Sequence, residues 1–312
     1  MHSDRVKHLQ ALDINQLLID IFGRPVEKKD IGNHDDLRNF VCSIEDKYIF
    51  KAFSNKNGWK REVQNLVRAT KSLFSLPEII DFGMVGNIGW IVMTVVNGEN
   101  LAATYNNMPS IEKRQLWYTV GQLLANFHNN NAISSCEANF LSVKLHGAAR
   151  KTYLEHVKEL YFYHRGMIVD NDYYGNEEAY MSVFSVIEAW LAKNNGTDNL
   201  LTLCHHDFSL RNILYDASLK KFGLIDFEMG FYTEAESDFT RLLLDLIPQG
   251  YDDDFFNGYF KESVIITRDD KNIYVYLLLK LVEICSWSFV RANDHYTDAF
   301  TLLRGIAKMY SG

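Results

Sequence analysis

The chain has 312 residues, 32 Lys and Arg against 40 Asp and Glu, and a formal net charge of −8 at pH 7. Its composition, 47% hydrophobic and 23% charged, excludes disordered, collagen-like and coiled-coil proteins. The acidic balance argues against a nucleic-acid binder, and no apolar run approaches the ~20 residues of a membrane span. The polar residues 1–5 do not resemble a secretory signal, so we expect a soluble, cytoplasmic protein with no membrane partner.

The first 97 residues have the pattern of short strands around one helix. A polar turn at 45–47 separates two apolar runs and predicts a β-hairpin. Apolar residues at helical spacing predict a helix over 59–73. The predicted strands are 41–44, 48–53, 76–80 and 88–96. This pattern indicates a small antiparallel lobe over residues 1–97.

After Gly98 the pattern becomes helical. Apolar residues repeat at helical spacing between 116 and 127, again over 151–191, and over 272–310. We therefore predict an α+β chain in which a larger, mainly helical lobe, 98–312, follows the first. Residues 98–312 hold 19 basic and 28 acidic residues, a balance of −9. Four well-separated cysteines, with no C-x-x-C pair, predict buried thiols and no disulfide framework or zinc site: Cys42, Cys136, Cys204 and Cys285.

The most informative stretch is 203–215, in which apolar runs enclose a polar loop that contains His205, Asp207 and Asn212. Fourteen residues after Asn212, an apolar strand ends in Asp226. This order and spacing match the catalytic and metal loops of the kinase fold. Mg²⁺ prefers oxygen ligands, which the Asp226 carboxylate and the Asn212 amide would supply. Asp207 would accept the proton of the attacking hydroxyl and would not be a metal ligand.

Such chemistry also needs a lysine that binds phosphate. Lys51 follows an apolar run in the predicted hairpin, and Glu62 on the next helix is placed to pair with it. Segment 30–40 occupies the place of a phosphate-covering loop but has the single glycine Gly32. We expect His34 in this segment to be a turn residue.

Together these residues resemble the aminoglycoside phosphotransferase family of small-molecule kinases, which also includes choline-kinase-like enzymes. The resemblance covers most of the chain. Besides the residues above, it rests on the segments 76–83, 93–101, 120–128, 225–228 and 237–239.

The resemblance implies a two-lobed protein-kinase-like fold that uses ATP, with GTP as the alternative, and Mg²⁺. It places adenine against the backbone of Thr94, Val95 and Val96. It makes Asp238 the aspartate that braces the catalytic loop, and we interpret His205 as a second bracing residue. His206 departs from the family, which usually has glycine between the catalytic His and Asp.

The acceptor is less constrained. Acidic clusters at 170–178 and 252–254 lie among aromatic residues, which favours a cationic molecule with a hydroxyl group. An aminoglycoside or amino sugar, and with it antibiotic resistance, is the leading interpretation; choline, amino alcohols and neutral metabolites remain open. A nucleotide-binding pseudokinase or regulatory module is the alternative from another class, but it would typically have lost one of four residues that are all present: Lys51, Asp207, Asn212 and Asp226. A protein kinase would need an A-P-E-like segment, which is missing after Asp226. The chain could be a monomer or a homodimer.

Overall fold

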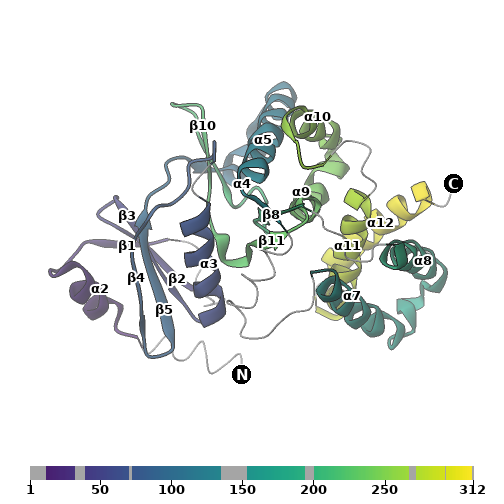
Figure 1. Cartoon of the computed structure of the whole chain (residues 1–312), viewed down its shortest axis with the longest axis horizontal. Helices are drawn as coiled ribbons and strands as arrows, with labels where there is room; N and C mark the ends of the chain where they lie inside the picture. Colours follow the sequence, from purple (N-terminus) through teal and green to yellow (C-terminus); the bar gives the residue numbers. More distant parts are fainter. Residues whose placement is uncertain are drawn as a thin grey trace. The chain divides into compact units, whose positions relative to one another are not determined.

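Figure 1 shows a computed structural model of the chain, which describes residues 12–31, 39–69, 72–134, 153–193, 200–266, 272–291 and 293–310. The chain forms two compact units. The first comprises residues 1–107 and 210–231, and the second comprises 108–209 and 232–312. The segment that contains Asn212 and Asp226 therefore belongs to the same unit as the N-terminal residues. The division into lobes at residue 97 stays a prediction, because compactness alone does not define a functional lobe.

The first unit is built on a five-stranded antiparallel sheet of order β1-β2-β3-β5-β4. The predicted β-hairpin is confirmed, with a turn at Glu45 and Asp46. Lys51 lies on the central strand, opposite Val41 on one neighbour and Ile91 on the other. The strands are β1 (Lys28–Asp30), β2 (Asn39–Ile44), β3 (Tyr48–Phe53), β4 (Ile79–Val85) and β5 (Ile88–Thr94).

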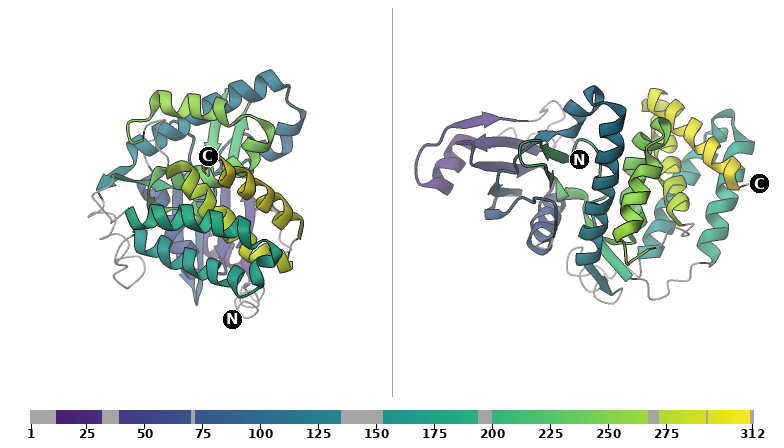
Figure 2. Two further views of the ribbon diagram at one scale, coloured as in Figure 1. Left: turned by 90° about the vertical axis from the view of Figure 1, so that its right-hand side faces the viewer. Right: turned by 90° about the horizontal axis from the view of Figure 1, so that it is seen from above.

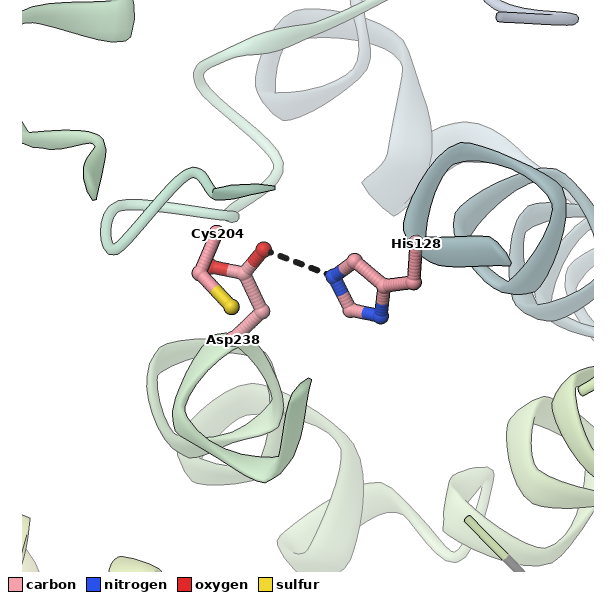
Figure 3. A group of neighbouring side chains, drawn as sticks. All are labelled: His128, Cys204 and Asp238. Atoms are coloured by element: carbon pink, nitrogen blue, oxygen red, sulfur yellow. Dashed lines mark hydrogen bonds and ion pairs between the residues drawn. The ribbon is translucent and has the colours of Figure 1, made fainter. Parts of the chain in front are cut away.

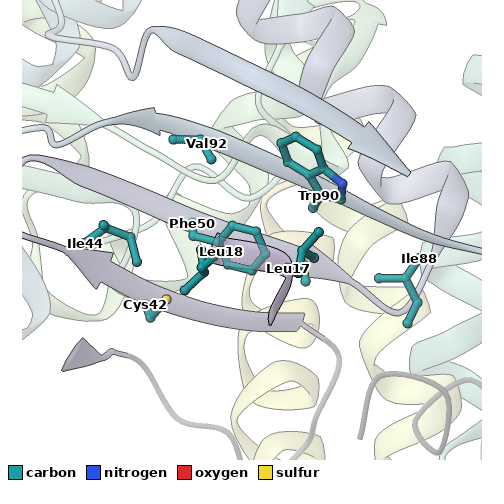
Figure 4. Packing of buried hydrophobic residues seen from close by; sticks show 9 residues of the cluster. Leu17, Leu18, Cys42, Ile44, Phe50, Ile88, Trp90 and Val92 are labelled. Carbon is teal, nitrogen blue, oxygen red and sulfur yellow. The ribbon is translucent and has the colours of Figure 1, made fainter. Parts of the chain in front are cut away.

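Alternation along β3 gives the sheet two different faces. Phe50 and Ala52 point into an apolar cluster with Leu17 and Leu18 of helix α2 (Ile14–Phe22), shown in Figure 4. Lys51 points to the opposite face, where its ammonium contacts helix α3 (Lys56–Arg68). The apolar cluster thus packs against one face of β3, and the opposite face of the strand carries Lys51.

Two boundaries differ from the sequence prediction. Helix α3 starts earlier than residue 59 because the Asn55 side chain accepts the N–H of Asn57 and caps it, and it ends at Arg68 instead of 73. The sequence analysis predicted one helix in this region and missed α2. Asp13 caps the start of α2, and Gly23, with φ 68°, caps its end.

A second small sheet of the first unit, of order β10-β9-β6, positions Asn212 and Asp226. Strands β9 (Ile213–Asp216) and β10 (Lys221–Leu224) form an antiparallel hairpin, and β6 (Glu99–Asn100) pairs with β9. Gly98 has φ 126°, and a Cβ there would lie 2.8 Å from the Tyr215 carbonyl carbon, so glycine is required for this close approach. Short helical turns complete the unit: α4 (Leu101–Thr104), η1 (Tyr105–Asn107) and η3 (Phe227–Met229).

The second unit is mostly helical (Figure 2). Helices α5 (Ser110–Asn130) and α10 (Asp252–Glu262) pack closely through glycines: a Cβ at Gly258 would lie 1.9 Å from the Tyr118 carbonyl oxygen. Its helices are α5 (Ser110–Asn130), α7 (Tyr153–Val169), α8 (Glu177–Lys193), α9 (Phe239–Leu246), α10 (Asp252–Glu262), α11 (Asn272–Arg291) and α12 (Asn293–Tyr310). A small sheet of order β11-β8-β7 and three short turns accompany them: β7 (Ala132–Ser134), β8 (Leu200–Cys204), β11 (Phe231–Thr233), η2 (Asp172–Gly175), η4 (Ala235–Asp238) and η5 (Ile247–Gln249).

Among the described residues, one segment, Ile273–Val290 of α11, is long and apolar enough to cross a membrane, and 61% of it is buried inside the structure. Helix α11 packs against α7, α8, α9 and α12, as expected for the core helix of a folded unit. The predicted burial of Cys42, Cys204 and Cys285 is confirmed, and all three are free thiols. Cys136 lies outside the described residues.

Candidate active site

Lys51 is the centre of an ionic cluster in the first unit, in which Lys51 and Glu62 are buried and Asp226 and Glu228 are partly exposed. Its Nζ lies 2.6 Å from Glu62 Oε2, 2.7 Å from Asp226 Oδ1 and 3.7 Å from Glu228 Oε2. Burial opposes the charge of Lys51, but the three carboxylates outweigh this effect and raise the pKa of the ammonium. Burial also raises the pKa of Glu62 to about 7; Lys51 opposes this, while the charges of Asp226 and Glu228 add to it. The structure therefore brings the predicted lysine, its glutamate and the predicted metal aspartate together.

The carboxylates of this cluster fit a divalent cation. One oxygen each of Glu62, Asp226 and Glu228 lies within 4.8 Å of the others. Three carboxylates around one ammonium leave an excess of two negative charges when all are ionised, and carboxylate oxygens are the ligands that Mg²⁺ prefers. Sequence reasoning missed Glu228. The available signal was its place two residues after Asp226, where the D-F-G motif of protein kinases has glycine.

Helix α3 holds the loop that carries Asp226 and Glu228. Arg61 Nε donates to the Glu228 carbonyl at 2.7 Å, and Asn65 Nδ2 donates to the carbonyls of Phe227 and Gly230 at 3.0 and 2.7 Å. A Cβ on Gly58 of α3 would lie 2.3 Å from Glu228 Oε1, so the helix passes directly against this carboxylate. Asp226 itself has φ 68°, a strained conformation that needs such support.

Asn212 reaches the same region through the β9–β10 hairpin. Its carbonyl accepts the N–H of Ile225 at 3.0 Å, and its side chain is buried. Because Ile213 pairs with Leu224 in this hairpin, Asn212 and Asp226 extend from neighbouring strand ends. Lys51, Glu62, Asn212 and Asp226 thus all lie in the first unit.

The predicted adenine contacts begin at Thr94, the last residue of β5. The N–H groups of Thr94 and Val95 donate to the carbonyls of Glu78 and Lys47 at 2.9 and 3.3 Å. The Val96 side chain lies over Gly223, where a Cβ would come within 2.3 Å of it. A nucleotide role for residues 94–96 stays a prediction. Of the predicted phosphate-covering segment 30–40, Asp30 ends β1 and Asn39 and Phe40 begin β2, whereas residues 32–38, with Gly32 and His34, lie outside the described residues.

Asp207 belongs to the second unit, in a loop braced by Asp238. The N–H groups of His205 and His206 donate to the two carboxylate oxygens of Asp238 at 2.7 and 2.6 Å. His128 Nε2 lies 3.1 Å from Asp238 Oδ2, the contact drawn in Figure 3. Burial would raise the pKa of Asp238, but the hydrogen bond and charge of His128, followed by the other histidines, hold it below its ordinary value. The bonds place Asp238 where the predicted brace would be.

His128, Cys204 and Asp238 also have the spacing of metal ligands. The oxygens of Asp238 already accept the bonds just described, and Cys204 Sγ lies 3.4 Å from the Glu234 carbonyl. We therefore interpret this cluster as a hydrogen-bonded brace. His205 is fully buried, and its Nδ1 accepts the N–H of Asp207 at 3.3 Å, a bond that engages the predicted bracing residue with the loop.

These features can be compared with known proteins. A family model described as the phosphotransferase enzyme family matches residues 35–269, which is more than half of the chain. The chain belongs to this family. No curated protein matches it.

Solved structures share the fold at low identity. A thermostable mutant of the aminoglycoside phosphotransferase APH(4)-Ia, without ligands, has a TM-score of 0.67 at 14% identity, with 96% of this chain and 100% of that chain covered. The GDP complex of aminoglycoside 2'-phosphotransferase-IIIa has a TM-score of 0.65 at 14% identity, with 95% and 97% covered. The streptomycin–ATP–APH(2'')-IIa complex has a TM-score of 0.60 at 16% identity, with 94% and 96% covered.

The family match and the fold confirm several predictions. The α+β, protein-kinase-like fold is confirmed, with an antiparallel sheet in the N-terminal part and a mostly helical C-terminal part. This member of the phosphotransferase enzyme family is a small-molecule kinase, and its use of ATP or GTP stays a prediction. The acceptor, the metal and the roles of individual residues stay predictions.

Proposed function

We propose that this kinase transfers the γ-phosphoryl group of ATP to a hydroxyl of a small cationic molecule, such as an aminoglycoside or amino sugar. The observation that carries the proposal is the ionic cluster in which the buried Lys51 contacts both the buried Glu62 and the partly exposed Asp226. Phosphoryl transfer depends mainly on positioning and on neutralising phosphate charge. A lysine held in place by a buried glutamate, beside a carboxylate able to hold a metal, suits that task.

Each residue then has a role. Lys51 binds phosphate oxygens, and Glu62 fixes the direction of its ammonium. Asn212 and Asp226, with Glu228 as a further carboxylate, hold Mg²⁺, which when bound neutralises charge on the phosphates. Asp207 accepts the proton of the acceptor hydroxyl. The backbone of residues 94–96 binds the base.

The charge of the chain supports a cationic acceptor. Residues 98–312 have a balance of −9, and an acidic field raises the local concentration of cations. Structures of similar fold include complexes with hygromycin B, kanamycin and streptomycin. The two acidic clusters give less support, because Glu177, Glu178 and residues 252–254 lie in the first turns of α8 and α10, where the helix dipole itself favours acidic residues.

The acceptor class can be tested by measuring ADP release with ATP and Mg²⁺ in the presence of kanamycin, hygromycin B, streptomycin, choline or glucose. We expect turnover with at least one of the three aminoglycosides and none with Asp207→Asn, the matched control. Turnover with glucose alone would refute the cationic acceptor, and turnover with choline alone would replace the amino sugar with an amino alcohol. If an aminoglycoside is the substrate, expression of the chain should also raise the concentration of that antibiotic needed to stop bacterial growth.

A further inference from the structure

His206 adopts a backbone conformation that residues other than glycine rarely adopt. It stands between His205 and Asp207 and has φ 61°, in the left-handed region that a Cβ disfavours. Glycine would reach this conformation freely. A histidine in this conformation needs contacts that compensate for the backbone strain. The second unit supplies one contact to the main chain of His206 and one to its side chain.

The main-chain contact is the bond from the His206 N–H to Asp238, and the side-chain contact is with Thr233. His206 Nε2 lies 3.1 Å from Thr233 Oγ1, and Thr233 is fully buried on β11. Thr233 Oγ1 in turn lies 2.7 Å from Ser237 Oγ, and Ser237 Oγ lies 2.8 Å from the Glu234 carbonyl oxygen. The imidazole is therefore the first member of a row of hydrogen bonds that ends on the backbone.

The Glu234 carbonyl anchors both hydroxyls of this row. A carbonyl oxygen only accepts, and it lies 2.8 Å from Ser237 Oγ and 3.3 Å from Thr233 Oγ1. The two hydroxyls are themselves 2.7 Å apart, and either can donate to the other. The row therefore links the His206 ring through Thr233 and Ser237 to the Glu234 carbonyl, in either tautomer of the ring.

We propose that His206 is a positioning residue that fixes the orientation of Asp207 through this bond to Thr233. The inference rests on the proposed function, in which Asp207 accepts the proton of the acceptor. Asp238 holds the His206 N–H and Thr233 holds its ring. On the other side of the peptide that joins His206 to Asp207, the Asp207 N–H donates to His205 Nδ1 at 3.3 Å. A glycine in this place would have the same φ available but no ring to anchor it.

The test replaces Thr233 by valine, which removes the hydroxyl and keeps the shape of the side chain. We expect kcat with the acceptor found in the ADP-release screen to fall about tenfold or more, while KM for ATP and for the acceptor changes by less than about twofold. Thr233→Ser should restore kcat. The matched control is Thr240→Val, which removes a buried hydroxyl bonded to the Ser237 carbonyl at 2.9 Å and should leave kcat unchanged.

His206→Gly provides a second route to the same loss. It should lower kcat as Thr233→Val does, and the double variant should lose no more than either single variant, because both remove one contact. Wild-type kcat in Thr233→Val or in His206→Gly would overturn the proposal. Losses that multiply in the double variant would do the same.

A readout without turnover separates this proposal from the proposed function. In ¹⁵N-histidine NMR, wild type should show a hydrogen-bonded Nε2 resonance that is absent in His206→Gly, shifted in Thr233→Val and unchanged in Thr240→Val. The backbone amide of Asp207 should exchange with solvent about tenfold faster in Thr233→Val. If no acceptor is turned over, the proposed function fails while these spectra still decide the contact. A resonance and an exchange rate that Thr233→Val leaves unchanged would refute it.

Discussion

Asn65 is the side chain through which α3 holds the loop that carries Asp226, so Asn65→Ala separates this support from the ionic cluster itself. Asn65 is 3% exposed, and its amide donates to the carbonyls of Phe227 and Gly230. A buried hydrogen bond contributes about 1 kcal/mol net, so losing two should lower the free energy of unfolding by about 2 kcal/mol. The corresponding fall in melting temperature is about 4–8 °C.

The assay follows thermal unfolding by tryptophan fluorescence, since Trp59 and Trp90 both lie in the first unit. Calorimetric titration with ATP and Mg²⁺ on the same samples should show about tenfold weaker binding, because Asp226 is no longer held in its strained conformation. Gln64→Ala, at the preceding position of the same helix, is the control and should change stability by less than about 0.5 kcal/mol. An Asn65→Ala protein with wild-type melting and wild-type affinity for the nucleotide would refute the support assigned to α3.

Three further predictions concern the charged residues. Asp207→Asn should reduce turnover by about a thousandfold and leave ATP affinity within about twofold, as measured by steady-state kinetics and calorimetry; substantial residual turnover would remove Asp207 from its role as the base. Glu228→Gln should weaken Mg²⁺ binding in the presence of ATP about tenfold without weakening ATP binding measured in EDTA, and equal Mg²⁺ affinity would show that Glu228 is not a ligand. Burial raises the pKa of Glu62 from 4.5 to about 7 in the folded state. Between these pH values the folded state binds more protons than the unfolded state, so the contribution of protonated Glu62 to stability is lost as the pH rises from 5 to 7. Urea unfolding at pH 5, 6 and 7 should therefore show a smaller decline for Glu62→Gln than for wild type, and identical declines would contradict the raised pKa.

Spacing in the sequence was sufficient to predict most of the ionic cluster. Lys51 follows an apolar run and Glu62 falls on the next amphipathic helix, and both patterns are local. Asn212 and Asp226 were recognisable because the loop and strand around them have a fixed order. The α2 helix was missed, although Asp13 and Gly23 mark its two ends, because the prediction was guided by the strand pattern around it.

Contacts between distant segments could not be predicted in this way. Glu228 meets Lys51, and Asn65 meets the loop after Asp226, only because α3 and the β9–β10 hairpin fold into one unit. The acidic clusters were predicted to attract a cationic acceptor, and this stays a prediction. Glu177, Glu178 and residues 252–254 lie in the first turns of α8 and α10, where the helix dipole also favours acidic residues.

The central claim is that phosphoryl transfer takes place on this chain to a hydroxyl of a cationic acceptor. It is tested most directly by ³¹P NMR of wild type and Asp207→Asn with ATP, Mg²⁺ and kanamycin, hygromycin B or streptomycin. The account predicts a new phosphomonoester resonance that grows as the γ-phosphate signal falls, in the wild-type sample alone. Loss of the γ-phosphate to inorganic phosphate only, with every acceptor, would contradict it.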